Sequence, residues 1–190
     1  MDHLHEGVQS ASGELSPMEL KKMRGSLILV LFSLAIPLFV LIDVRVLMVG
    51  AYVSPEANQI IGLVAAVLML VSWVTVGEAL RGVKERNFKR VLSSIRLSLL
   101  LGFVSWLLIG VQVVNHSVNS LTHYGETFLV SLGTIDVYLL FGLAALLSVR
   151  MRVRNFGAAV DHQWGVYSTA LYWRFTIIVW IVMYAVLYLV

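Results

Sequence analysis

Cysteine and charged residues are what this sequence lacks most clearly. None of its 190 residues is a cysteine and only 13% are charged, whereas 59% are apolar and the mean hydropathy is +0.87. A soluble domain averages about a quarter charged residues, so this composition is typical of a protein that lies in a bilayer. The absence of cysteine excludes disulfides, iron–sulfur clusters and thiolate metal sites.

Histidine is also scarce, and no histidine falls in the middle of a long apolar run. The five are His3, His5, His116, His123 and His162. Histidine is the usual intramembrane ligand of haem and copper. The sequence therefore predicts no catalytic, cofactor-binding or metal-binding residue within the membrane. His116, His123 and Glu126 could bind a metal at the outer surface, but their spacing matches no strong metal motif and favours ordinary solvated loop residues.

Recognisable catalytic motifs are missing as well. There is no Gly-rich phosphate loop, no nucleophile elbow and no paired metal-ligand motif. Four glycines are scattered along apolar runs, where small residues let neighbouring helices approach closely. They are Gly102, Gly110, Gly133 and Gly142. We interpret them as packing positions.

What the sequence does contain is five apolar runs, each long enough to cross a membrane. A bilayer core of about 30 Å needs about 20 apolar residues as helix. The predicted fold class is therefore all-α: a polytopic membrane protein with five transmembrane helices in a bundle. A polar tail over residues 1–25 lacks the features of a signal peptide, and the five-helix domain is expected over 26–190. The spans are predicted at 26–51, 59–80, 91–114, 125–149 and 166–190.

Lysine and arginine occupy only alternate connections between these spans. They are Lys21, Lys22 and Arg24 before the first span, Arg81, Lys84, Arg86, Lys89 and Arg90 between the second and third, and Arg150, Arg152 and Arg154 between the fourth and fifth. The connections 52–58 and 115–124 contain neither residue type. Because basic loops stay on the cytoplasmic side, the N-terminus is predicted inside and the C-terminus outside.

Apart from Glu126 at the very start of the fourth span, the acidic and basic residues within the predicted spans are Asp43, Arg45, Glu78, Arg96, Asp136 and Arg174. We expect Asp43 and Arg45 to reach the outer interface. Glu78 and Arg96 are candidate partners near the inner surface, across a short hairpin. Asp136 and Arg174 lie deeper, where a lone charge costs about 3 kcal/mol to insert. Both are therefore expected to face protein rather than lipid.

The heights of Asp136 and Arg174 in their spans suggest a contact. At 1.5 Å per residue, they lie roughly 20 Å and 12 Å from the inner ends of their spans. The offset of about 8 Å is close to the reach of an extended arginine. We expect Asp136 and Arg174 to form a buried ion pair that is structural rather than catalytic. The alternative is that Arg174 snorkels inward alone while Asp136 meets water or a partner subunit.

The last apolar segment resembles a known family. "ALYWRFTIIVWIVMYAVLYL" at 170–189 is similar to the last helix of subunit III of haem–copper oxidases, which typically ends in "YWHFVDVVWLFLFPLLYL". The matching aromatic residues Tyr172, Trp173, Phe175 and Trp180 are predicted to be packing residues. "YGETFLVSLGTIDVYLLFGLAALL" at 124–147 is similar to that family's "YGSTFFLLTGFHGLHVLIGLI" helix. The resemblance covers about residues 26–190.

The titratable positions of the family pattern are nearly all replaced. Leu34 stands where the family has a glutamate in its "SE..LF" motif, and Ile135 and Tyr138 stand where it has two histidines. Arg174 and Ile177 replace the histidine and aspartate of "YWHFVD". The family's lipid-binding and proton-antenna residues therefore cannot be carried over to this chain.

The resemblance implies a subunit that carries no cofactor. Haem and copper would lie in a partner catalytic subunit I of a respiratory complex, and reduction of oxygen would belong to that complex. The other expected partners are further subunits and membrane lipids, with no nucleic acid, in the inner (plasma) membrane of a cell. Two alternatives stay open: an accessory subunit of a nitric oxide reductase, and a free-standing transporter or lipid-binding membrane protein.

Overall fold

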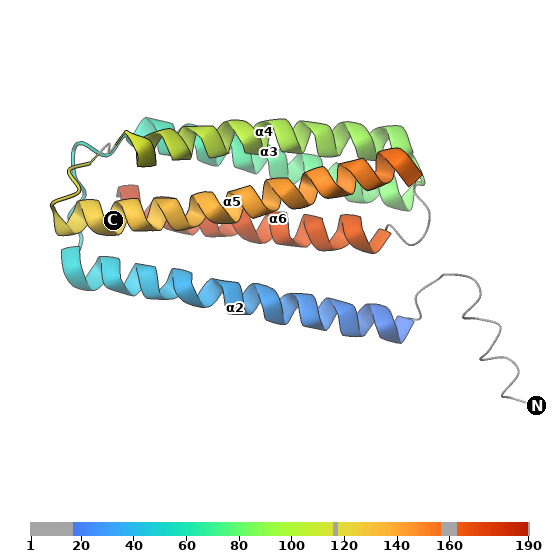
Figure 1. The fold of residues 1–190 in the computed structure, drawn as a ribbon, viewed down its shortest axis with the longest axis horizontal. Helices are drawn as coiled ribbons and strands as arrows, with labels where there is room; N and C mark the ends of the chain where they lie inside the picture. Colours follow the sequence, from blue (N-terminus) through green and yellow to red (C-terminus); the bar gives the residue numbers. More distant parts are fainter. Residues whose placement is uncertain (1–16, 116–117, 157–162, 190) are drawn as a thin grey trace, which may run out of the picture.

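The described part of the chain is made of helices joined by short connections and contains no strand (Figure 1). The structure is a computed structural model, and it describes residues 17–115, 118–156 and 163–189. Its elements are α2 (Pro17–Val49), α3 (Gln59–Lys84), α4 (Phe88–Val114), α5 (His123–Phe156), α6 (Gln163–Tyr184) and a final π-helical turn η3 (Ala185–Leu189). The all-α prediction is confirmed.

Five helices are long and apolar enough to cross a membrane, as the sequence predicted. The protein is a multi-pass membrane protein. Each of these helices extends beyond its predicted span, and the extension is largest in α2, which begins at Pro17, and in α5, which continues to Phe156. The reason is that hydropathy detects the part of a helix in lipid, while good helix formers such as lysine and arginine continue the helix beyond it. Proline also suits the first position of α2.

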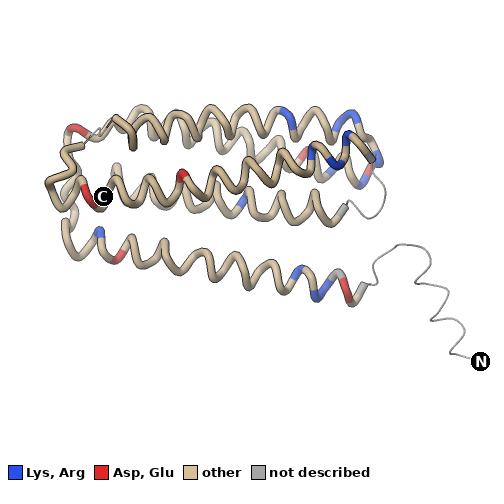
Figure 2. Tube along the Cα trace, in the orientation of Figure 1, with Lys and Arg blue, Asp and Glu red and all other residues tan. Residues whose placement is uncertain are grey.

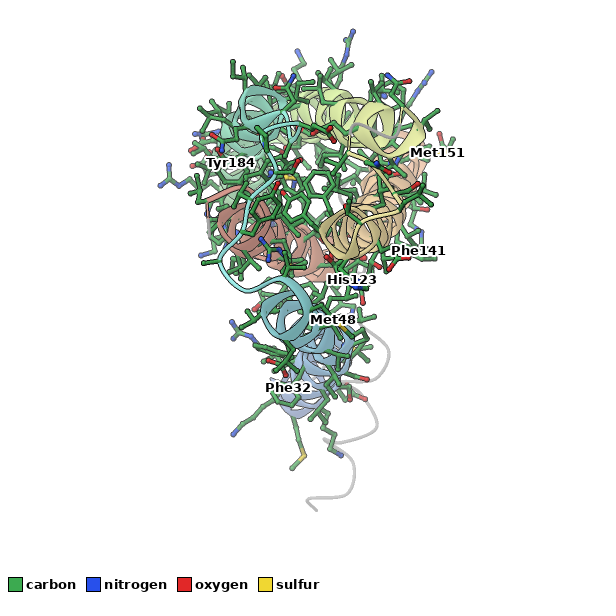
Figure 3. The ribbon with its side chains drawn as sticks, turned by 90° about the vertical axis from the view of Figure 1, so that its left-hand side faces the viewer. Phe32, Met48, His123, Phe141, Met151 and Tyr184 are labelled. Carbon is green, nitrogen blue, oxygen red and sulfur yellow. The ribbon has the colours of Figure 1, made fainter. Side chains whose placement is uncertain are left out.

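Helices α3, α4, α5 and α6 form a four-helix group, and α2 packs beside it. Within the group α3 adjoins α4 and α6, while α5 adjoins α4 and α6. The end-on view shows side chains filling the space between these four helices, with α2 outside and next to α5 and α6 (Figure 3). Only 11% of the most apolar window of α2 is buried, against 44% in α6. The core therefore belongs to α3–α6.

Basic residues gather at one end of the bundle, where α2 begins, α3 turns into α4 and α5 ends (Figure 2). We call this the basic end. Its hairpin between α3 and α4 is tight: the Asn87 side chain accepts a hydrogen bond from the Arg90 backbone N–H at 3.2 Å. Arg86 has a φ of 53°, in the left-handed region that closes such turns. The side of the membrane that this end faces stays a prediction.

At the opposite end, Arg45 holds the connection between α2 and α3. Its guanidinium donates to the carbonyl oxygens of Gly50 and Tyr52, at 2.8 and 2.6 Å. It also lies 4.9 Å from the centre of the Tyr124 ring on α5. Arg45 is only 1% exposed, so it is covered by the protein itself, and its place at the membrane interface stays a prediction. The physical reason is that the C-terminal end of α2 offers unpaired carbonyls, which an arginine can satisfy. Asp43 is exposed.

Candidate functional site

Trp173 is the side chain that joins all four core helices. It is fully buried, and its ring Nε1 donates to the Ser72 hydroxyl of α3 at 2.8 Å. The ring also fills a slot between Gly102 of α4 and Gly142 of α5. A Cβ added at these glycines would lie 2.5 Å and 2.7 Å from Trp173 ring atoms. Both positions therefore have to be glycine for the ring to fit.

Small hydroxyl residues complete the contact between α3 and α4 beside Trp173. The hydroxyls of Thr75 and Ser98 are 2.6 Å apart, and the Ser72 hydroxyl donates to the Ser98 carbonyl at 3.3 Å. Nearer the other end, the buried Ser105 hydroxyl donates to the Leu101 carbonyl of its own helix at 3.0 Å. Small polar residues let membrane helices approach closely and bond across the interface.

The other aromatic residues of the last helix have separate places. Trp180 is fully buried. The Tyr172 hydroxyl donates to the Tyr138 carbonyl of α5 at 3.0 Å, and the Tyr138 hydroxyl donates to the Leu34 carbonyl of α2 at 3.0 Å. Phe175 lies in an apolar groove between α6 and α2. These two tyrosine hydrogen bonds link α6, α5 and α2.

An aromatic cluster closes the end of the bundle opposite the basic end. Tyr188 of η3 is buried, and its hydroxyl donates to the Gln112 side-chain carbonyl of α4 at 2.9 Å. Its ring stacks on Tyr184 and meets Phe128 of α5 edge-on, with centroids 5.2 Å apart in each case. The Tyr124 hydroxyl donates to the Leu187 carbonyl at 2.8 Å. The end of the last helix is thus fixed to α4 and α5.

Glu78 has different partners from the one expected. Its two carboxylate oxygens bind Arg81 at 2.6 Å and Arg90 at 2.5 Å. Arg96 has no ion pair among the described residues. The reason is rotational: Ile95 faces the core, so the next residue, Arg96, points out of the bundle. Glu78 does lie at the basic end, but it closes the α3–α4 hairpin through Arg90.

Asp136 and Arg174 do not form the expected pair in the structure. Asp136 lies in a groove along α4, about 340 Å³ in volume, beside Trp106 and Gly110. Its Oδ1 is buried and has no hydrogen-bond partner among the described residues. Arg174 lies in a different groove, along α3. The correction has a geometric cause, because the first side chain points from α5 toward α4 and the second points from α6 toward α3.

For His116, His123 and Glu126 the sequence favoured ordinary solvated loop residues over a metal site. His123 Nδ1 and Glu126 Oε2 lie 4.0 Å apart at the end opposite the basic end, while His116 lies outside the described residues. Within residues 17–115, 118–156 and 163–189, no group of three or more histidine, cysteine or acidic side chains could hold a metal ion. The contacts of the described residues are therefore helix-packing contacts, and Trp173 lies at their centre.

The sequence of this chain is similar to that of known proteins. A family model described as cytochrome c oxidase subunit III matches residues 48–190. The chain belongs to this family. Cytochrome c oxidase subunit 3 of Gallus gallus is 29% identical over 137 residues, which is 72% of this chain and 52% of that protein. The Struthio camelus protein of that name is 27% identical over the same shares, and that of Loxodonta africana is 30% identical over 64% of this chain and 47% of its own.

The residues matched by the subunit III model include the four core helices of the structure. The chain spans about half the length of the curated relatives it matches. The matched residues 48–190 contain α3 to α6 but almost none of α2. The slot that holds Trp173 therefore lies entirely inside the matched part. Tyr138, inside the matched part, and Leu34, outside it, are joined by the hydrogen bond between α5 and α2.

Two structural residues were missed by reasoning from the sequence. Arg45 looked like an interfacial residue, and Tyr138 looked only like a replaced histidine. A signal for Arg45 was present: it stands four residues before the end of α2 and five before Gly50, which has a φ of +66°. Arginine near a helix C-terminus can bond the last carbonyls. Nothing in the sequence pointed to the backbone of Leu34 as the acceptor for Tyr138.

Proposed function

We propose that this chain is a non-catalytic, integral-membrane subunit III of a terminal haem–copper oxidase, which packs against the catalytic subunit and stabilises it. The observation that carries the proposal is the subunit III match over residues 48–190, which includes the Trp173 slot and all four core helices. A chain whose buried side chains are used for helix packing suits a scaffold rather than a reaction centre.

Haem and copper would be held by the partner catalytic subunit. Among the described residues of this chain, no group of three or more histidine, cysteine or acidic side chains could hold a metal ion. Oxygen reduction, with electrons from cytochrome c or a quinol, would belong to the complex. We place the chain in the inner (plasma) membrane of a cell, with its basic end in the cytoplasm, because basic connections remain on that side.

Purification of the native complex tests this proposal. The tagged full-length chain is extracted in mild detergent, and the eluate is examined for haem spectrum and for consumption of oxygen and of nitric oxide. We expect a haem-containing complex that consumes oxygen. The chain separated from that complex is expected to be free of haem, and stoichiometric haem on the chain alone would contradict the assignment.

One observation favours a second candidate, an accessory subunit of a nitric oxide reductase. Leu34, Ile135 and Ile177 stand at three titratable positions of the family pattern, which suits a partner that needs no proton pathway. In the same experiment, consumption of nitric oxide rather than oxygen would favour this candidate. An intact-complex gel with no haem in the band of this chain would instead favour a free-standing transporter or lipid-binding protein.

A further inference from the structure

A groove with a single charged residue lies between α4 and α5, which pack side by side (Figure 1). It is about 340 Å³ in volume, at the small end of the pockets that hold ligands. Leu107, Val111 and Val114 of α4 line it, and each is at least 45% exposed, so the groove opens on the outside of the bundle. The Asp136 carboxylate lies against Gly110, where an added Cβ would be 3.6 Å from Oδ1. We call it the Asp136 groove.

The Asp136 carboxylate is not neutralised by any described residue. It takes part in none of the ion pairs between them, and its buried Oδ1 accepts no hydrogen bond from them. Trp106, which also lines the groove, offers only the uncharged N–H of its ring. A charge within a membrane is costly unless it is paired. The groove is therefore suited to a cation that this part of the chain does not supply.

The height of the carboxylate limits what can bring this cation. Gly110, which adjoins it, is four residues before the end of α4 at Val114, so it lies about 6 Å below that end. The 27 residues of α4 span about 40 Å, which is about 10 Å more than a hydrocarbon core. The carboxylate therefore lies close to the membrane boundary opposite the basic end. A side chain with an apolar stem and a charged tip, such as lysine or arginine, can reach it along the apolar wall.

Gly133 indicates that a helix covers the adjoining surface of α5. It stands three residues before Asp136 and so lies on the same face of the helix. A Cβ added at Gly133 meets nothing within 4 Å, so packing among the described residues does not require glycine there. Glycine disfavours a helix relative to alanine, but it lets a second membrane helix approach closely. A partner helix on this face would explain why the position is glycine.

A second copy of this chain does not offer the cation at the right height. Copies inserted with the same orientation keep equivalent residues level in the membrane. Arg174 lies eleven residues after Gln163 and so about 16 Å from the basic end, whereas Asp136 lies twenty residues before Phe156 and so about 30 Å from it. Among the described basic residues, only Arg45 lies farther from the basic end, and it is buried within its own chain. The cation therefore has to come from a different protein.

We propose that the Asp136 groove docks a transmembrane helix of a partner subunit, and that a lysine or arginine of this helix binds the Asp136 carboxylate. The stem of that side chain lies along Leu107 and Val111, and its tip donates a charge-assisted hydrogen bond to Oδ1. The helix itself packs on Gly133. The inference rests on the proposed function, because the complex supplies the partner helix. It adds the surface and the charge by which this chain joins that complex.

Retention of the complex by variants of the full-length chain tests the proposal. The tagged chain is purified with its complex in mild detergent and diluted, and the haem-bearing complex that stays on the tag is followed over time. Asp136→Asn keeps the shape of the side chain and removes its charge. It should shorten the half-life of retention about tenfold, the loss of one charge-assisted hydrogen bond.

Asp43→Asn is the matched control, since it removes the same charge from an exposed position on α2, toward the same end of the bundle. It should leave the half-life unchanged. Equal half-lives for the Asp136→Asn and Asp43→Asn variants would overturn this inference and leave the proposed function standing. A wild-type chain that retains no haem-bearing complex would refute both.

Thermal unfolding of the isolated chain separates docking from a structural role within the chain. Without its partner the Asp136 charge is unpaired, so Asp136→Asn should leave the Tm of the isolated chain unchanged or raise it. The same variant should therefore weaken the complex without weakening the chain. A lower Tm for the isolated Asp136→Asn variant would show that the carboxylate stabilises the chain itself, and would overturn the proposal.

Photo-cross-linking within the assembled complex identifies the partner helix. Benzoylphenylalanine is placed at Val111, in the groove, or at Val71, a residue of similar exposure on α3. Illumination should link position 111 to a transmembrane helix with a lysine or arginine within one turn of the linked residue, as mapped by mass spectrometry. A link from position 111 to a second copy of this chain, or to a helix without lysine or arginine, would refute the proposal. So would a partner linked from position 71 and none from position 111.

Discussion

Replacing Gly102 with alanine is expected to destabilise the bundle through one contact. The new methyl group would lie 2.5 Å from two ring carbons of Trp173. The ring has no room to move away, because Gly142 meets its other side and Ser72 binds its Nε1. Overpacking of this kind costs about 1–3 kcal/mol. For a chain of this length, where 1 kcal/mol shifts the Tm by about 2–4 °C, the loss corresponds to a Tm lower by about 2–12 °C.

Gly133→Ala is the matched control for this prediction. A Cβ added at Gly133 meets nothing within 4 Å, and alanine favours a helix over glycine by about 1 kcal/mol. This variant is therefore expected to melt at the wild-type temperature or slightly above it. The assay is thermal unfolding of the purified full-length chain in one detergent at one scan rate, followed by tryptophan fluorescence.

A second comparison isolates the contact itself. Combining Gly102→Ala with Trp173→Leu should cost less than the sum of the two single changes, since the smaller side chain frees the space that the new methyl needs. Equal Tm losses for Gly102→Ala and Gly133→Ala would refute the reasoning. So would strict additivity of Gly102→Ala with Trp173→Leu.

Three other perturbations follow from the contacts described above. Arg45→Met should leave two carbonyls without their donor and lower the free energy of unfolding by about 2 kcal/mol, while Asp43→Asn, at an exposed position, should change it little. Denaturant titration compares the two variants. Equal effects of the two changes would contradict the buried role of Arg45. Tyr138→Phe removes the hydroxyl that binds α2 and should lower the free energy of unfolding by about 1 kcal/mol. Hydrogen exchange should increase more in α2 than in α3. An equal increase in both helices would argue against the link between Tyr138 and α2. Cysteines placed at Ser120 and Arg152 should react with impermeant reagent from opposite sides of the membrane, and labelling from one side would overturn the topology.

The number of membrane-spanning helices could be predicted from the sequence, because the bilayer fixes how many apolar residues a span requires. The packing role expected of the aromatic residues in 170–189 is consistent with the structure, where Trp173 and Trp180 are fully buried. The partner of Trp173 was harder to predict. Nothing in the sequence says that Gly102 and Gly142, far apart along the chain, face the same ring.

The directions in which side chains point could not be predicted, and this explains the Asp136–Arg174 error. In a membrane protein both the core face and the lipid face of a helix are apolar, so the pattern does not reveal rotation. The helices also extend beyond the predicted spans, which added to the error in height. Measured from Phe156 and Gln163, the two residues differ in height by about 13 Å, not about 8 Å. The same uncertainty of rotation led to Arg96 rather than Arg90 as the expected partner of Glu78.

The slot for Trp173 also has a consequence for the order of assembly during synthesis. Helices leave the ribosome in chain order, so α3, α4 and α5 enter the bilayer before the tryptophan that fits between them has been made. Until α6 arrives, Gly102 and Gly142 border a gap the width of an indole ring, and the Ser72 hydroxyl lacks its donor. Insertion of the last helix is therefore the step that locks the first three core helices together.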